Sequence, residues 1–381
     1  MIARPGWFSL RLCATFCFLQ GIGYGQFSAA GSISTMYDDN IDNNHLQIAD
    51  RIGQLSLDLE HSWASEQEDF VINYNGALTY FSEVVDRTFN NHSAGLSFER
   101  RLDEDGQSTL SLGTSYSLRL DRGEYEFYDH GQFALSGVLR NSFAERFRGQ
   151  LSYSFRTLRF PELADFNYDE HEGALRLTTF LPTKTTIIVD GSIGIKAYKT
   201  TNALTATTGQ MQGRRGRLVE ASAPGVTQLR GLLRVGQSIA DGTGLSLAGT
   251  YQTNLQKESR YLGSDFGVVS DDDLFDDHYG YEGLSGNLMV TQILFQDMTL
   301  RFTADHQYRE YTGRPAYDLD GMQIADLRCD TRRSLAMQAE YAFPTLNFSI
   351  AVAFDYIWNE STDLFYTYTN NALTIALTVP Y

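Results

Sequence analysis

The chain ends with Asn371-Ala-Leu-Thr-Ile-Ala-Leu-Thr-Val-Pro-Tyr381, in which large apolar residues alternate with small ones. The large side chains are Leu373, Ile375, Leu377, Val379 and Tyr381, and the residues between them include Ala372, Thr374, Ala376 and Thr378. Successive side chains of a β-strand point to opposite faces. The period of two therefore predicts a strand that lies between two different environments.

The same alternation recurs along almost the whole chain. In 108–120 and 346–359, one face is apolar and the other is mostly polar or small. Further segments cover 54–63, 147–157 and 371–381, or start near Phe27, Asp69, His92, Tyr128, Tyr168, Thr185, Val226, Gly244, Tyr279, Met298 and Thr331. These segments predict an all-β protein of about 16 strands, with a range of about 14 to 18.

The connections between the predicted strands alternate in length. The short connections are 65–68, 103–107, 142–146, 181–184, 240–243, 295–297 and 343–345. The long ones include 38–51, 82–91, 200–225, 258–278, 312–330 and 360–370. Tight turns at one end and long loops at the other are typical of antiparallel membrane barrels, with the turns in the periplasm and the loops outside the cell.

The alternating strands, their even number and the final aromatic residue together resemble bacterial outer-membrane β-barrel, porin-like proteins. The resemblance covers the whole predicted barrel and includes no motif of a specific family. It implies a transmembrane antiparallel β-barrel in the bacterial outer membrane, surrounded by lipid. It also implies that the barrel-assembly machinery reads the C-terminal strand from Leu373 to Tyr381. Porin-like barrels often form trimers, so the resemblance is also compatible with a homo-oligomer.

The first 25 residues have the pattern of a secretory signal peptide. Arg4 and Arg11 are basic, 12–19 is apolar, and Gly23-Tyr-Gly25 is a small-x-small cleavage site. The alternative is a buried N-terminal strand. We predict that 1–25 is removed and that 26–381 forms a single barrel domain. The mature chain would then keep one cysteine, Cys329, which excludes an internal disulfide or a cysteine metal site.

The composition narrows the function classes. The formal charge is −17 and the pI about 4.8, so nucleic acid is not an expected partner. Phe and Tyr number 24 and 22 against 7 Pro, which suits an all-β protein. After residue 25, no run of 18 apolar residues predicts a membrane-spanning helix. The mean hydropathy of −0.29 fits a soluble protein equally well and decides nothing.

Charged residues of both signs fall on the predicted inner faces. The pore-lining candidates are Arg230, Arg234, Arg301, Arg309, Asp305, Asp355 and Glu340. Rings of charge on a pore wall set ion preference. Arg230 and Arg234 share one face of one strand, which is compatible with a basic stripe for anionic solutes. The alternative, which the near balance of signs favours, is that acids and bases neutralise each other across the wall.

Three loops carry further candidates. The longest, 200–225, contains Arg214, Arg215 and Arg217, and it either folds inward as a constriction or stays at the surface. The segments 270–278 and 38–44 are rich in Asp and Asn. Neither has the spacing of an EF-hand calcium loop. We therefore interpret both as solvated acidic loops.

Motifs for chemistry are absent from the sequence. The seven His residues are scattered, and no G-x-S-x-G, P-loop or dinucleotide fingerprint occurs. A rim dyad of His278 and Asp276 is the one catalytic arrangement left open. We expect no enzyme activity, no catalytic residue, no cofactor and no metal site.

These observations favour a water-filled outer-membrane channel for passive diffusion of small hydrophilic solutes. Sixteen strands leave a lumen that their own side chains do not fill. The alternative is a scaffold barrel that sheathes or anchors an export or electron-transfer complex. The run Met36-Tyr-Asp-Asp-Asn40 resembles openings of barrels linked to exopolysaccharide export. A lateral transporter for apolar molecules is disfavoured by the polar inner faces.

Overall fold

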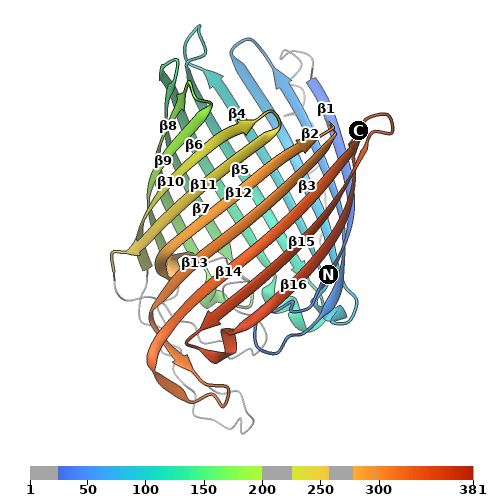
Figure 1. Ribbon diagram of the computed structural model, residues 1–381, viewed down its shortest axis with the longest axis vertical. Helices are drawn as coiled ribbons and strands as arrows, with labels where there is room; N and C mark the ends of the chain where they lie inside the picture. The colour runs from blue at the N-terminus through green and yellow to red at the C-terminus, as the bar shows by residue number, and fades with distance from the viewer. Residues whose placement is uncertain (1–24, 200–224, 257–277, 296, 381) are drawn as a thin grey trace, which may run out of the picture.

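The computed structural model describes residues 25–199, 225–256, 278–295 and 297–380 (Figure 1). The described residues form sixteen strands. The strands are β1 Gly25–Asp38, β2 Asp50–Ala64, β3 Glu68–Phe81, β4 Phe89–Arg101, β5 Ser108–Asp121, β6 His130–Ala144, β7 Phe147–Arg159, β8 Tyr168–Leu181, β9 Thr185–Tyr198, β10 Gly225–Ala240, β11 Thr243–Asn254, β12 Glu282–Leu294, β13 Met298–Tyr317, β14 Gln323–Phe343, β15 Phe348–Ser361 and β16 Tyr368–Pro380. The predicted number of strands is confirmed.

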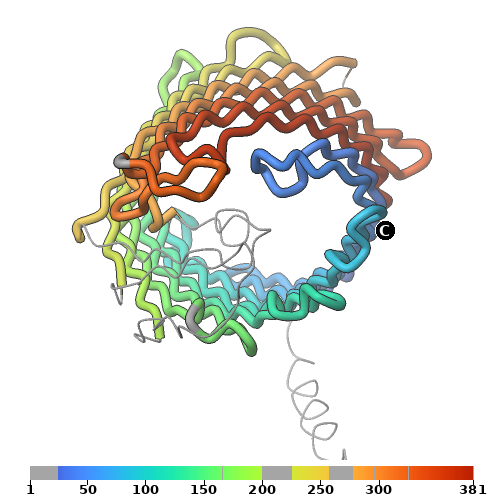
Figure 2. The backbone as a smooth tube through the Cα atoms, turned by 90° about the horizontal axis from the view of Figure 1, so that it is seen from below, coloured from blue at the N-terminus to red at the C-terminus, as the bar shows by residue number. Residues whose placement is uncertain are grey.

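The strands close into one antiparallel barrel. Each pairs with its neighbours in sequence, and β1 pairs with β16 from Ala30–Pro380 to Asp38–Ala372. The closed ring is visible along its axis in Figure 2. Closure matters because lipid cannot hydrogen-bond to backbone N–H and C=O groups, so a strand in a membrane needs partners on both edges.

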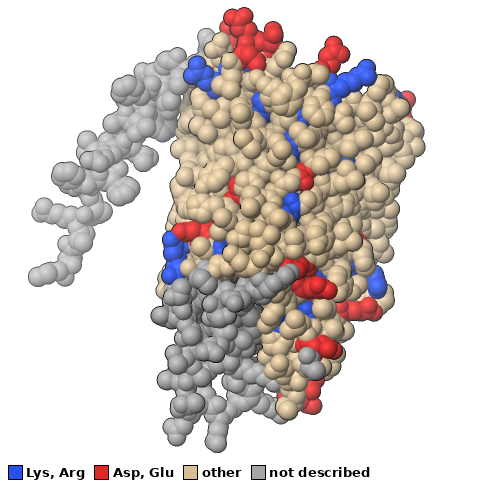
Figure 3. Space-filling view, turned by 90° about the vertical axis from the view of Figure 1, so that its left-hand side faces the viewer, with Lys and Arg blue, Asp and Glu red and all other residues tan. Residues whose placement is uncertain are grey.

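The outer face of the barrel is apolar, the reverse of a soluble protein. Leu373 and Ile375 of β16 are 45% and 47% exposed, and Leu55 of β2 is 58% exposed. The predicted alternation of the last strand is therefore confirmed for Leu373, Ile375, Leu377 and Val379, while Tyr381 lies outside the described residues. Figure 3 shows a largely uncharged wall, with most charged side chains toward the two ends. This is the surface of a transmembrane barrel.

The structure also confirms the predicted difference in length between the connections at the two ends of the barrel. Two- to six-residue turns such as 65–67, 145–146 and 241–242 lie at one end, and longer segments such as 39–49 and 122–129 lie at the other. One predicted loop is wrong. Within 312–330, β13 and β14 continue as a hairpin that projects beyond the barrel (Figure 1). The guanidinium of Arg328 stacks between Tyr311 and Tyr366, at 4.1 and 3.4 Å from their ring centres, and fixes the base of this hairpin.

Among the residues that the structure describes, helical structure is limited to short 3₁₀ turns, such as η3 Gly123–Tyr128 and η6 Leu364–Tyr366. Among the described residues, no helix is long and apolar enough to cross a membrane. The predicted signal peptide lies outside the described residues, apart from Gly25, which opens β1.

Candidate functional site: the barrel lumen

The inner wall of the barrel is made largely of small and polar side chains. Across β4 to β7, the wall of a broad hollow includes Gly95, Gly113, Ser115, Ser136 and Ser154. These residues alternate with outward leucines and aromatics because the strand period is two. Small residues keep the wall thin, and their hydroxyl and backbone groups are compatible with contact to water.

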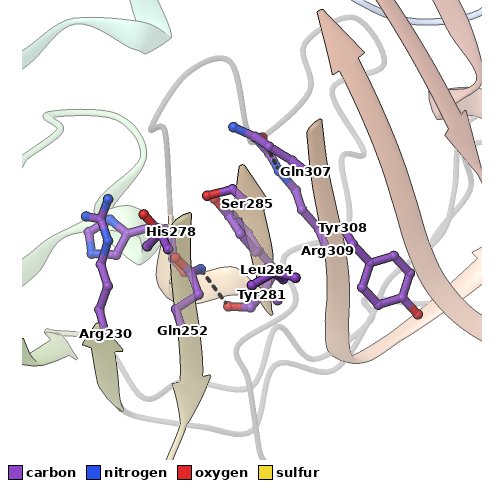
Figure 4. Close-up of a pocket in the computed structure, with 11 residues that line it drawn as sticks. Arg230, Gln252, His278, Tyr281, Leu284, Ser285, Gln307, Tyr308 and Arg309 are labelled. Carbon is purple, nitrogen blue, oxygen red and sulfur yellow. Dashed lines mark hydrogen bonds between the residues drawn. The ribbon is translucent and has the colours of Figure 1, made fainter. Parts of the chain in front are cut away.

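Two of the predicted lining residues meet in a recess between β10 and β13. Arg230 and Arg309 line this recess, which has a volume of about 220 Å³, together with Gln252, His278 and Tyr281 (Figure 4). The guanidinium of Arg309 lies 4.6 Å from the ring centre of Tyr281 and donates to Gln307 Oε1 at 2.6 Å. Two guanidinium groups therefore belong to one concave, polar part of the wall.

The turn that completes the recess is held by glutamine side chains. Gln252 Nε2 donates to the carbonyl oxygens of His278 at 2.9 Å and Tyr281 at 3.1 Å. Gln228 Nε2 donates to the same His278 carbonyl at 2.7 Å. These bonds supply hydrogen-bond donors to carbonyl groups at the wall. They also fix the turn between 278 and 281 against β10 and β11.

The other predicted lining residues lie at inward register positions on separate strands. Arg301 donates to Gln338 Oε1 at 3.1 Å, and Asp305 accepts from Asn287 Nδ2 at 2.7 Å. Arg234 faces Ala248, Glu340 faces Ala351, and Asp355 faces Ala336 and Ala372. The structure thus places the seven candidates around the β10–β15 side rather than in one cluster.

Ion pairing divides the wall into two parts. On β4 to β9, Arg140 pairs with Glu99 at 3.2 Å, Arg176 pairs with Asp190 at 2.8 Å, and Arg156 pairs with Glu170. Mutual neutralisation across the wall is therefore found there. Within the described part of the chain, no ion pair involves Arg230, Arg234, Arg301, Asp305, Glu340 or Asp355. These six residues are therefore not neutralised by a direct ion-pair partner, whereas Arg328 of β14 pairs with Asp330 at 2.6 Å.

One of the two loops that we predicted to be solvated enters the lumen instead. The segment 39–49 between β1 and β2 projects inside the ring of strands (Figure 2, blue). Asn40, Asp42 and Asn44 are at most 1% exposed, so the prediction of a solvated acidic loop is wrong for this segment. Ile41 packs against Ile52 and Phe81 and provides an apolar anchor.

Hydrogen bonds tie this inward loop to the far end of the sequence. Asn40 Nδ2 donates to the carbonyl oxygens of Asn44 at 2.8 Å and Thr369 at 3.1 Å. Asn370 Nδ2 donates to the Asn40 carbonyl at 2.9 Å, and the His45 N–H donates to the Phe365 carbonyl at 2.9 Å. The side-chain amides thus form hydrogen bonds with backbone groups of this loop, as the backbone of a neighbouring strand does within a sheet.

The buried carboxylate of the loop is paired. Asp42 forms an ion pair with Arg87, which follows β3. Burial raises the pKa of Asp42, and the guanidinium of Arg87 offsets part of that rise. Asn43 and Gln47 have φ of 49° and 52°, a region that Asn tolerates better than most residues. Alternating Asp and Asn were therefore a signal for this tight, self-bonded loop.

Several predictions fall outside the described residues. These are the proposed constriction loop with Arg214, Arg215 and Arg217, the acidic run before His278, and Asp276 of the rim dyad. Among the residues that the structure does describe, no group of three or more His, Cys, Asp and Glu could hold a metal ion.

The chain matches no family model and no curated protein. Among solved structures, it is similar to Acinetobacter baumannii OccAB1, with a TM-score of 0.52 and 10% identity over 94% of this chain and 96% of that one. The comparison with OprD from Pseudomonas aeruginosa gives a TM-score of 0.48 and 12% identity, over 93% of this chain and 94% of that one. The comparison with a bacterial polysaccharide outer membrane secretin gives a TM-score of 0.49 and 9% identity, over 93% of this chain and 98% of that one.

The likeness to OccAB1 extends over nearly the full length of both chains. At 10% identity it shows a shared fold and nothing about the substrate. The fold is that of the outer-membrane β-barrels that the sequence resembles. The predicted scaffold function gains no support from these comparisons.

Proposed function

We propose that this protein is a channel of the bacterial outer membrane through which small hydrophilic solutes diffuse passively. The observation that carries the proposal is the pairing of an apolar outer face with a small, polar inner face around a closed ring of strands. Side chains do not fill a barrel of this strand number. Water is therefore expected to occupy the space that the inward loop leaves.

The inward loop 39–49 narrows the path in this proposal. The Asn40 side chain and backbone carbonyl are hydrogen-bonded to Thr369 and Asn370 of β16, and the His45 N–H donates to the Phe365 carbonyl before β16. The loop therefore acts as a fixed constriction that sets the size limit. Selectivity by charge would come from residues such as Arg230, which has no ion pair among the described residues and lines the recess between β10 and β13.

A liposome swelling assay tests this function. Liposomes that contain the purified protein are placed in iso-osmotic solutions of uncharged sugars of increasing size. We expect swelling that slows steadily as the sugar grows, because passage through a pore of fixed width is limited by size. Protein unfolded by heat before reconstitution serves as the control. Exclusion of every sugar by the folded protein would refute the channel.

A further inference from the structure

One positive charge lies unexpectedly deep on the lipid-facing side of the barrel. Arg333 is on the outward row of β14 with Leu335 and Met337, which are 46% and 58% exposed. The β14–β15 ladder begins on the loop side at the pair Asp330–Ser361, so Arg333 lies three residues inside that end. A charge on the lipid face is costly at the centre of a bilayer and tolerated near its interfaces.

The strand geometry places Arg333 at the edge of the apolar band. The outward residues that follow it on β14 are uncharged as far as Phe343, near the short-turn end. Ten residues span about 33 Å along a strand, which is about 25 Å along the membrane normal at a tilt of about 40°. This is the usual height of the apolar band of such barrels. Arg333 therefore lies level with lipid headgroups.

Two side chains beside Arg333 favour the binding of an anion at its guanidinium. Its guanidinium carbon lies 4.7 Å from the ring centre of Trp358, which is directly opposite in register. On the other side, His306 is directly opposite in register on β13, so its side chain shares the outward face. A guanidinium and an imidazole on adjacent strands provide donors that match the oxygens of a phosphate.

The acidic neighbours are too weakly engaged to occupy the guanidinium. Glu360 lies 3.7 Å from Arg333, and their side chains are 52% and 44% exposed. At this distance the contact is longer than a hydrogen bond, so it does not occupy the N–H donors of the guanidinium. One row further out, Glu310 already accepts a hydrogen bond from Tyr308 at 2.8 Å. The donors of Arg333 can therefore turn toward a stronger anion from the lipid.

From this geometry we infer that Arg333 and His306 bind the phosphate headgroup of an anionic lipid in the outer leaflet. Trp358 supports the guanidinium from the side of β15. The inference rests on the proposed membrane placement, with the long loops outside the cell. It is independent of whether the lumen conducts. The occupant is a lipid rather than a free anion, because the site lies at the edge of an apolar surface that acyl chains cover.

Native mass spectrometry of the detergent-purified protein tests the site. Diphosphoryl lipid A, the same lipid without its phosphates, and inorganic phosphate are titrated separately. The variants are Arg333→Gln and His306→Gln. The matched control is Arg332→Gln, because Arg332 is the preceding residue of β14 and faces Gln307 and Asn359 at an inward position.

We expect Arg333→Gln to weaken binding of diphosphoryl lipid A about tenfold, the effect of losing one charge-assisted hydrogen bond. His306→Gln should weaken it less, and Arg332→Gln should leave it unchanged. Equal binding of the dephosphorylated lipid, or unchanged binding by Arg333→Gln, would overturn the inference. So would inorganic phosphate that binds as tightly as the lipid. A barrel that binds lipid A in this pattern without conducting would refute the channel alone.

Discussion

At the scale of single residues, the lumen contains charges of two kinds. Arg176 is neutralised by Asp190, whereas Arg230 has no ion pair among the described residues and lines a recess with Arg309. A charge with a close partner contributes little to the field in the pore, because the two fields cancel at a distance. Charged residues without a close ion-pair partner should therefore dominate selectivity.

Replacement of Arg230 tests this distinction. A unit charge at about 8 Å in water is worth about 0.5 kcal/mol. We expect Arg230→Gln to lower the anion-to-cation permeability ratio about twofold, measured as the reversal potential across a KCl gradient. The control is the double variant Arg176→Gln with Asp190→Asn, which removes a neutral pair and should leave the ratio unchanged. An equal shift in both proteins would contradict the account.

The sequence predicted the side of the wall for Arg230 but not its surroundings. Period-two alternation places Arg230 on the inner face without reference to any neighbour. Which acid lies opposite each base depends on strand register. Register follows from all the turns and bulges together, and no local pattern of the chain reports it.

At the scale of elements, the strands were predictable and the inward loop was not. The last strand alternates without interruption, and its apolar face is exposed as predicted. The segment 39–49 is buried by amide hydrogen bonds and by Ile41, and neither feature has a period. The hairpin extension of β13 and β14 was missed for a similar reason, since stacking of Arg328 on Tyr311 and Tyr366 holds its base.

Asn40 is the residue on which the inward loop depends most. Its side chain makes two donor bonds and accepts the Asn44 N–H at 3.2 Å. At about 1 kcal/mol each, their loss costs about 3 kcal/mol. We expect Asn40→Ala to release the loop, raise single-channel conductance and expose 39–49 to added protease. Leu46→Ala, at a half-exposed position of the same loop, is the control and should change neither.

The pH response of the loop has a defined sign. The pKa of Asp42 is raised in the packed loop, so the packed form binds more protons than the released form as pH falls. Packing should therefore be favoured by mild acid and weakened as pH rises through the raised pKa. We expect conductance to stay constant or fall between pH 7 and about pH 4. An acid-induced increase that Asp42→Asn abolishes would contradict this.

At the scale of the whole molecule, the membrane placement and the channel function both depend on which face of the strands contacts lipid. Ile375 points outward near the middle of β16, and its neighbour Thr374 points inward. An Arg on the lipid face near the midplane costs about 2–4 kcal/mol. We expect Ile375→Arg to lower the unfolding free energy in lipid bilayers by this amount, and Thr374→Arg to change it far less. Urea titration in vesicles measures both. The opposite ranking would mean that the faces are exchanged.

The central claim is that lipid surrounds a closed ring of strands whose interior holds water. Single-channel recording of the purified protein in a planar bilayer tests it most directly. We predict stepwise current increments of uniform size as barrels insert, and larger increments for Asn40→Ala. Folded protein that enters the bilayer without any ionic current would contradict the claim.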